Sequence, residues 1–135
     1  MTNPSAHHLS APPEPGFEHI NDDLCQGFQS HLEVIGRRWN SGIMLAAVRG
    51  ATRFSEYRAV VTGISDRLLS QRLRELEVEG LIERTVVPTT PVLVQYRPTE
   101  RGRELLRILQ PLVSYSRRWA SATANVTPIH AAPSH

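Results

Sequence analysis

In the stretch from Arg53 to Arg84, apolar and polar positions recur at regular intervals. Its central part, 66–79, reads as a helix when placed on a wheel of about 100° per residue. Four leucines fall on one side of that helix, namely Leu68, Leu69, Leu73 and Leu76. Polar side chains that can contact base edges and phosphates fall on the other side, namely Arg67, Ser70, Gln71 and Arg74. The pattern predicts one face in the core and one face available to DNA.

A shorter helix is expected just before it, from about Ser55 to Val61, with Ser55 as its cap and with Tyr57 and Val60 facing inward. Gly63 then supplies a turn between the two helices. Two helices joined by a short Gly-containing turn are typical of the helix-turn-helix. An alternative interpretation is an amphipathic helix whose polar face is merely solvated, because charged helix faces usually are.

Two more helices are expected upstream. The first runs from Asp22, whose carboxylate can accept bonds from free N–H groups of the first turn, to Gly36. Its apolar stripe comprises Leu24, Phe28, Leu32 and Ile35. The second begins at about residue 40 or 41 and stops at Gly50, with Trp39 in the core at its beginning. Its apolar positions are Ile43, Met44, Ala46, Ala47 and Val48.

A β-hairpin is expected after the longer helix, because two β-branched runs, 81–87 and 92–97, flank a short loop bounded by prolines. Pro98 lacks an N–H group and should end the strand pairing. Thr99 then caps a last helix over about residues 100–120. The predicted fold class is therefore mainly α with a small β-hairpin wing, a winged helix-turn-helix with about five to six helices.

The last helix is too apolar for a free surface. Its stripe comprises Leu105, Ile108, Leu109, Leu112 and Trp119, widened by Leu106 and Val113. The chain could bury one such face internally, but the excess favours a partner. Pro111 lies inside this helix and predicts a kink, since it removes one backbone bond and collides with the preceding turn.

Length and composition indicate one domain of 135 residues, expected over 21–122. The Pro-rich segment 1–20 and the tail 123–135 are predicted to be disordered. The chain has no apolar run near the ~20 residues of a membrane span and no signal-peptide pattern, so we expect a cytoplasmic protein without a membrane partner.

Charge is unevenly distributed around a net charge of +2. Residues 37–74 contain eight arginines against two acids, Glu56 and Asp66, which gives this zone a charge of +6. A positive zone centred on the helix-turn-helix is what a phosphate-facing surface requires.

No catalytic or metal-binding motif appears, and we predict neither an enzyme nor a cofactor. Five of the six histidines lie in the expected tails, namely His7, His8, His19, His130 and His135. His31 lies six residues from Cys25, so the two point to different faces of a helix. Cys25 falls in the first turn, where the helix dipole favours a reactive thiol, whereas the carboxylates of Asp22 and Asp23 oppose that effect. Either a small structural residue or a redox sensor fits Cys25.

The residues from Ile64-Ser65-Asp66 to Arg84 closely resemble the core of the HxlR family of bacterial transcriptional regulators, winged-helix proteins related to the MarR regulators. The segments 36–39, 53–56 and 91–102 resemble other signatures of that family, and the resemblance extends from Cys25 to Trp119. Four features depart from the family pattern: Gln26 follows the cysteine in place of a common proline, the spacing from the cysteine to Trp39 is one residue longer, Pro98 replaces a usual apolar residue, and the wing tip has no cation near Leu93.

The resemblance implies a homodimer that binds a double-stranded DNA operator, with dimerisation through the terminal helices and, in some members, a cysteine that senses quinones, aldehydes or oxidants. Cys25 is thus the candidate redox sensor, and an oxidant, electrophile or small molecule is the candidate effector. The dimerisation residues would be Leu24, Phe28, Leu105, Leu109, Leu112, Val113 and Trp119.

We therefore predict a repressor whose two copies of helix 66–79 enter major grooves about one helical turn apart, on an inverted repeat. Candidate base contacts are Arg67, Gln71 and Arg74, and candidate backbone contacts are Arg53, Ser55, Arg58, Ser65, Ser70 and the wing-tip Thr89 and Thr90. Arg72 is excluded because the wheel places it beside the core. The alternative function is a winged-helix module that binds a protein or ligand without reading DNA.

Overall fold

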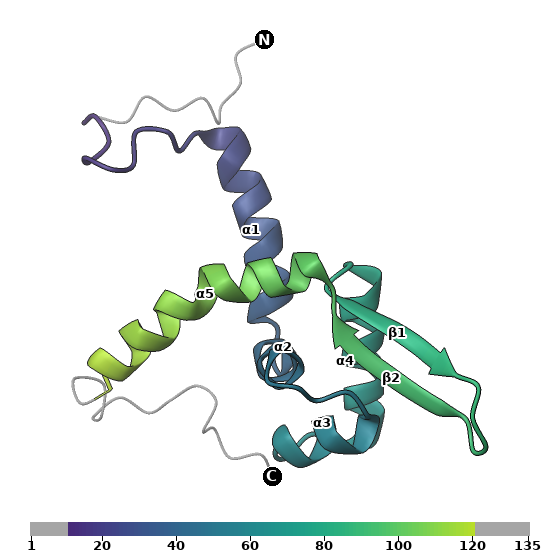
Figure 1. The fold of residues 1–135 in the computed structure, drawn as a ribbon. Helices are drawn as coiled ribbons and strands as arrows, with labels where there is room; N and C mark the ends of the chain where they lie inside the picture. The colour runs from purple at the N-terminus through teal and green to yellow at the C-terminus, as the bar shows by residue number, and fades with distance from the viewer. Residues whose placement is uncertain (1–10, 121–135) are drawn as a thin grey trace. The chain divides into compact units, whose positions relative to one another are not determined.

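The computed structural model describes residues 11–120, apart from the side chain of Asp22. This part contains the predicted kinds of element in the predicted order (Figure 1). They are α1 (Asp22–Gly36), α2 (Asn40–Val48), α3 (Phe54–Val60), α4 (Asp66–Val78), β1 (Ile82–Val87), β2 (Leu93–Pro98) and α5 (Glu100–Arg118). None of these helices combines the length and the apolar character needed to cross a membrane.

The chain divides into two compact units between Ser41 and Gly42, and each is described by itself. Residues 11–20, the described part of the predicted N-terminal arm, contain turns but no helix or strand. The predicted tail, 123–135, lies outside the described residues.

The first unit contains α1, whose bounds agree with the prediction. Its N-cap, however, is Asn21, whose Oδ1 accepts a bond of 3.0 Å from the N–H of Leu24. The prediction of Asp22 as the cap was wrong by one residue, because a cap must precede the helix in extended backbone, and Asp22 is already helical.

Trp39 lies between α1 and α2 and is half-buried, less than the predicted core position implies. Its backbone has a φ of 82°, and the Arg38 guanidinium lies 4.7 Å from the centre of the indole ring. The next residue, Asn40, is buried, and its Nδ2 donates a 2.7 Å bond to the carbonyl of Val34. This short connection is therefore fixed by ring and amide contacts rather than by burial of the tryptophan.

The second unit has a core of aliphatic side chains around Tyr57. Its buried residues include Ile43, Met44, Ala46, Ala47, Tyr57, Val61, Ile64, Leu69, Leu73, Leu76, Leu81 and Ile82. Val60, which was predicted to face inward, is instead exposed, and so is Val48, an apolar position of the second predicted helix. Each is the last residue of its helix, and at the end of α3 the chain turns so that the C-cap Val61 faces inward.

The start of α3 also differs from the prediction. Arg53, not Ser55, is the N-cap, and the carboxylate that satisfies the first N–H groups belongs to Glu56. Glu56 Oε1 accepts 2.9 Å bonds from the backbone N–H groups of both Arg53 and Thr52. These bonds, that from Arg53 first, lower the pKa of Glu56 below its usual value.

The hairpin pairs β1 with β2 antiparallel, from Ile82 opposite Pro98 to Val87 opposite Leu93. As predicted, the strand ends at Pro98. The backbone of Tyr96 is bonded at both ends: its N–H donates to the Thr52 carbonyl at 2.7 Å, and its carbonyl accepts from the Tyr57 hydroxyl at 2.8 Å. Burial raises the pKa of the Tyr57 phenol, so this hydroxyl remains a donor. The wing is thus fastened to α3 near its base (Figure 1).

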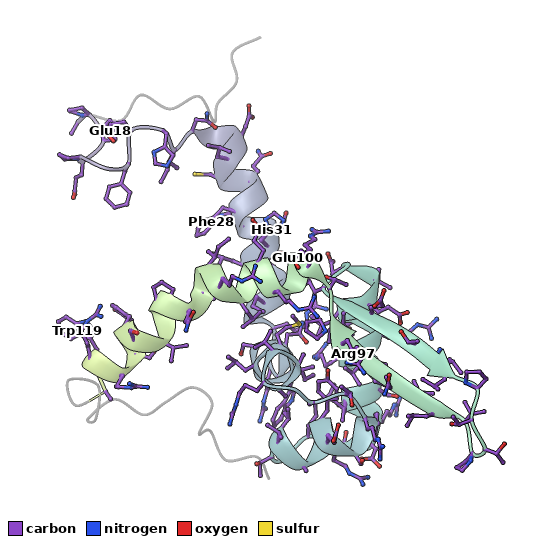
Figure 2. All side chains as sticks on the ribbon, in the orientation of Figure 1. Glu18, Phe28, His31, Arg97, Glu100 and Trp119 are labelled. Carbon is purple, nitrogen blue, oxygen red and sulfur yellow. The ribbon has the colours of Figure 1, made fainter. Side chains whose placement is uncertain are left out.

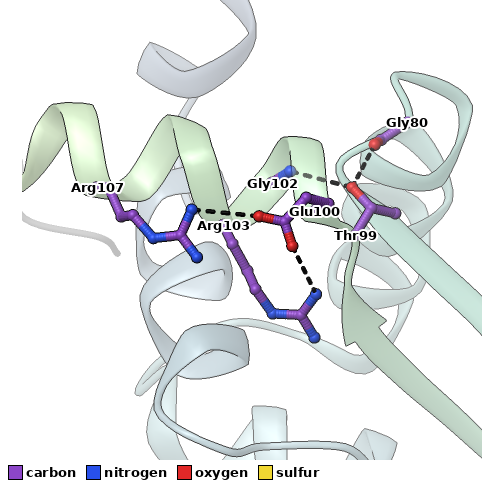
Figure 3. A network of polar contacts seen from close by, with 6 residues as sticks. All are labelled: Gly80, Thr99, Glu100, Gly102, Arg103 and Arg107. Atoms are coloured by element: carbon purple, nitrogen blue, oxygen red, sulfur yellow. Dashed lines mark hydrogen bonds and ion pairs between the residues drawn. The ribbon is translucent and has the colours of Figure 1, made fainter.

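The first turn of α5 is fastened to the turn that follows α4 (Figure 3). Thr99 Oγ1 accepts from the N–H of Gly102 at 3.0 Å, as predicted for a cap, and donates to the carbonyl of Gly80 at 2.6 Å. Gly102 is buried against the backbone of Leu81. The helix continues through Pro111 to Arg118, two residues short of the predicted end, and the kink at Pro111 stays a prediction.

Candidate nucleic-acid interface

Helix α4 is held by its cap and its apolar face. Ser65 Oγ accepts a 3.2 Å bond from the N–H of Leu68, which satisfies one free group of the first turn. Leu69, Leu73 and Leu76 are almost fully buried, whereas Leu68 is half-buried. The rotation of α4 about its axis is thereby set by the core, as the wheel predicted.

The opposite face of α4 is exposed over its whole length. Arg67, Ser70, Gln71 and Arg74 are all exposed, as predicted. Gln71 Nε2 lies 3.5 Å from Glu75 Oε2, a weak hydrogen bond that a base edge could replace. Arg72 is half-buried and donates to Glu75 Oε1 at 2.9 Å, in agreement with its exclusion from the interface.

The helix α3 adds three exposed candidates, Arg53, Ser55 and Arg58. Arg58 is engaged within the chain: its Nη1 lies 3.1 Å from Oδ1 and 3.0 Å from Oδ2 of Asp66, the first residue of α4. The sequence prediction missed this ion pair. Opposite charges that flank a short turn between two helices were the signal that could have revealed it.

The wing tip presents Thr89 and Thr90, and both are exposed. Thr89 is partly used by the loop itself, because its Oγ1 donates to the carbonyl of Pro91 at 2.7 Å. The strands carry two exposed arginines that the sequence prediction did not consider, Arg84 and Arg97. Arg97 Nη2 donates to Gln95 Oε1 at 3.2 Å. Cations therefore lie along the strands of the wing rather than at its tip.

The predicted dimerisation residues differ in exposure. In α1, Leu24 and Phe28 are exposed. In α5, Leu105 and Leu109 are half-buried, whereas Leu112, Val113 and Trp119 are exposed. Ile108 and Tyr115, which the prediction left out of this set, are exposed as well. Figure 2 shows Phe28 on α1 and Trp119 at the end of α5 as projecting side chains. Each helix thus presents apolar side chains to its surroundings.

Cys25 is a free, exposed cysteine in the first turn of α1. No group of three or more histidine, cysteine, aspartate or glutamate side chains that could hold a metal ion exists within the described part of the chain. Four of the histidines named above, His7, His8, His130 and His135, lie outside that part.

Comparison with known proteins adds an independent result. A model of the HxlR-like helix-turn-helix family matches residues 34–124. The chain is 36% identical over 97 residues to YvaP, an uncharacterized HTH-type transcriptional regulator of Bacillus subtilis (strain 168), across 72% of this chain and 90% of that protein. It is 34% identical over 97 residues to the HTH-type transcriptional regulator YodB of the same organism, across 72% of this chain and 87% of YodB.

Solved structures give the same picture. The reduced form of YodB matches with a TM-score of 0.64 at 32% identity, across 74% of this chain and 94% of that one. YodB structures also exist in a diamide-treated and a quinone-bound form. A protein from Enterococcus faecalis V583 assigned to the MarR family of transcriptional regulators matches with a TM-score of 0.68 at 27% identity, across 80% of this chain and 96% of that one. These likenesses confirm the predicted winged helix-turn-helix fold.

Proposed function

Because the chain belongs to the HxlR-like helix-turn-helix family of transcriptional regulators, we propose that it is a homodimeric repressor that reads an inverted-repeat operator with α4. Membership of the family agrees with the sequence prediction and makes the chain a regulator rather than an enzyme. The observation that carries the proposal is the exposed face of α4, where four polar side chains lie opposite a buried leucine stripe.

The residue types on that face match the donors and acceptors of the major groove. Arg67 and Arg74 carry guanidinium groups that can bond guanine O6 and N7 or a phosphate, and the Gln71 amide can bond adenine N6 and N7. Ser70, Ser65, Arg53 and the wing-tip threonines would contact the backbone and set the register.

The exposed apolar side chains support the homodimer. Ile108 and Leu112 project from α5 without burial within the described residues, which costs free energy in water that a second copy would recover. A dimer with two-fold symmetry would present its two α4 helices to two half-sites of opposite orientation.

The effector class rests on a relative and on one residue of this chain. YodB has been solved after diamide treatment and with bound quinone, and this chain has an exposed thiol at Cys25. We assign Cys25 as the group that responds to an oxidant or electrophile. Diamide should release operator from the wild type but not from Cys25→Ser, and equal release from both would rule out sensing through this thiol.

The regulator proposal is tested by a gel shift with the DNA upstream of the protein's own gene. We expect a sequence-selective band, and Gln71→Ala or Arg74→Ala should weaken it by about 1–3 kcal/mol and relax the preference at one operator position. Gln110→Ala, on the exposed surface of α5, is the matched control and should leave the band unchanged. Absence of any sequence-selective band would favour the alternative, a winged-helix module that binds a protein or ligand.

A further inference from the structure

The ion pair between Arg58 and Asp66 joins the two helices of the helix-turn-helix. Arg58 lies in the last turn of α3, and Asp66 is the first residue of α4. Both carboxylate oxygens lie within 3.1 Å of the same guanidinium nitrogen, Nη1. Each charge also suits its helix end, since helix C-termini favour cations and N-termini favour anions.

We propose that Asp66 competes with DNA phosphates for the Arg58 guanidinium and thereby lowers the affinity of the chain for DNA of any sequence. The inference rests on the proposed function, because it concerns the same DNA-facing surface. It assigns to Asp66 a role in tuning electrostatic attraction rather than in contacting bases.

Both partners are accessible to DNA. The side chains of Arg58 and Asp66 are 51% and 61% exposed, and Asp66 directly precedes Arg67 on the interface helix. A phosphate that approaches the N-terminal end of α4 would therefore meet a guanidinium that is already paired with a carboxylate. Because the pair is exposed, its strength is modest, and phosphate can displace Asp66 at a small cost.

The ion pair reduces the positive charge that this surface presents to DNA. The zone 37–74 has a net charge of +6, but the Arg58 charge within it is cancelled locally by Asp66. Binding to nonspecific DNA is nearly all electrostatic, and each phosphate that is neutralised contributes about 0.9 to the slope of log affinity against log salt. Arg58 in the wild type should therefore contribute less than a full unit to that slope.

The test uses fluorescence anisotropy with a short mixed-sequence duplex unrelated to the protein's upstream DNA, at several salt concentrations. Asp66→Asn keeps the size of the side chain and removes its charge. We expect this variant to bind the duplex about two- to fivefold more tightly at low salt, with a slope steeper by less than about one. Asp66→Glu, which restores a carboxylate, should bind like the wild type.

A matched control separates the pair from net charge alone. Glu79→Gln makes the same change in charge at the opposite end of α4 and should change affinity less than Asp66→Asn. The decisive comparison adds Arg58→Ala: in the double variant R58A/D66N, the gain in affinity and slope should disappear. Thermal unfolding of each variant, measured in parallel, confirms that the folded protein is compared.

Three results of these binding measurements would contradict the inference. If Asp66→Asn gains affinity equally with and without Arg58, the carboxylate merely repels DNA, and the competition is refuted. If Asp66→Asn binds like the wild type, the inference is refuted while the proposed function stands. If the wild type binds neither this duplex nor its upstream DNA at low salt, the proposed function and the inference both fail.

Discussion

Helices α4 and α5 each carry an apolar stripe of helical period, and the two stripes differ in how far they are buried. In α4, Leu73 is 1% exposed, and Leu69 and Leu76 on the same stripe are fully buried. In α5, Ile108 and Leu112 are 67% and 55% exposed. The comparison teaches that periodicity predicts which face of a helix avoids water, but not whether the same chain or another molecule covers it.

The polar faces of the two helices differ in a complementary way. On α4 the outward face is polar, so it is stable in water when no DNA is bound. On α5 the apolar side chains of Leu112 and Val113 are exposed, and covering them would gain free energy at about 25 cal/mol per Å². The exposed face of α4 thus suits the proposed contact with DNA, and the exposed apolar side chains of α5 suit the proposed contact with a second copy.

The largest expected effect tests the difference in burial between the apolar stripes of α4 and α5. Leu73→Ala should lower the free energy of unfolding by about 2–5 kcal/mol, because it leaves a cavity in the core. Leu112→Ala should cost under about 0.5 kcal/mol in the dilute monomer, where that side chain is exposed, yet weaken self-association. Urea unfolding and sedimentation equilibrium over a range of concentrations measure the two effects. A similar cost for both variants at monomeric dilution would show that α5 is covered by its own chain.

A smaller effect on stability should distinguish the buried first turn of α5 from its exposed C-terminal half. A Cβ added at Gly102 would clash with the carbonyl oxygen of Leu81 and lie 3.0 Å from Cε of Met44. Because the clash with backbone outweighs the gain in helix propensity, Gly102→Ala should lower the free energy of unfolding by about 1–3 kcal/mol. Ser114→Ala, in the exposed half of the same helix, is the control and should be neutral. Thermal unfolding of both variants shows whether only the first turns of α5 belong to the core.

The smallest effect concerns the N-terminal end of α3 and depends on pH. The pKa of Glu56 is lowered from 4.5, so its carboxylate stabilises the fold at neutral pH, and that contribution is lost as the pH falls through the folded-state pKa. Glu56→Gln should therefore be less stable than the wild type at pH near neutrality, and the difference should shrink in acid. Urea unfolding across this range measures the difference. A gap that is constant with pH would mean that the amide replaces the carboxylate fully.

Much of the fold could be predicted from the sequence, because its signals are local. Thr99 caps its helix as expected, and the leucine pattern of α4 determines its buried face. The errors at Asp22 and Ser55 were also local: several polar residues near each helix start could cap it, and the choice depends on where the first helical turn begins. Such shifts of one or two residues do not alter the architecture.

The parts that the sequence did not reveal depend on contacts between elements. The burial of Val61 rather than Val60 depends on how the chain leaves α3, and the ion pair of Arg58 with Asp66 depends on the angle of the turn. The exposure of the candidate interface residues on α4 could be predicted residue by residue, whereas the ion pair of Arg58 required the geometry.

The hydroxyl of Thr99 has a mechanical consequence. A single oxygen atom holds the carbonyl of Gly80, just beyond α4, and the N–H of Gly102, in the first turn of α5 (Figure 3). A rotation of α5 about its first turn must therefore either break the bond to Gly80 or carry the trailing end of α4 with it. The hydroxyl group of Thr99 thus couples the end of α4 to the start of α5.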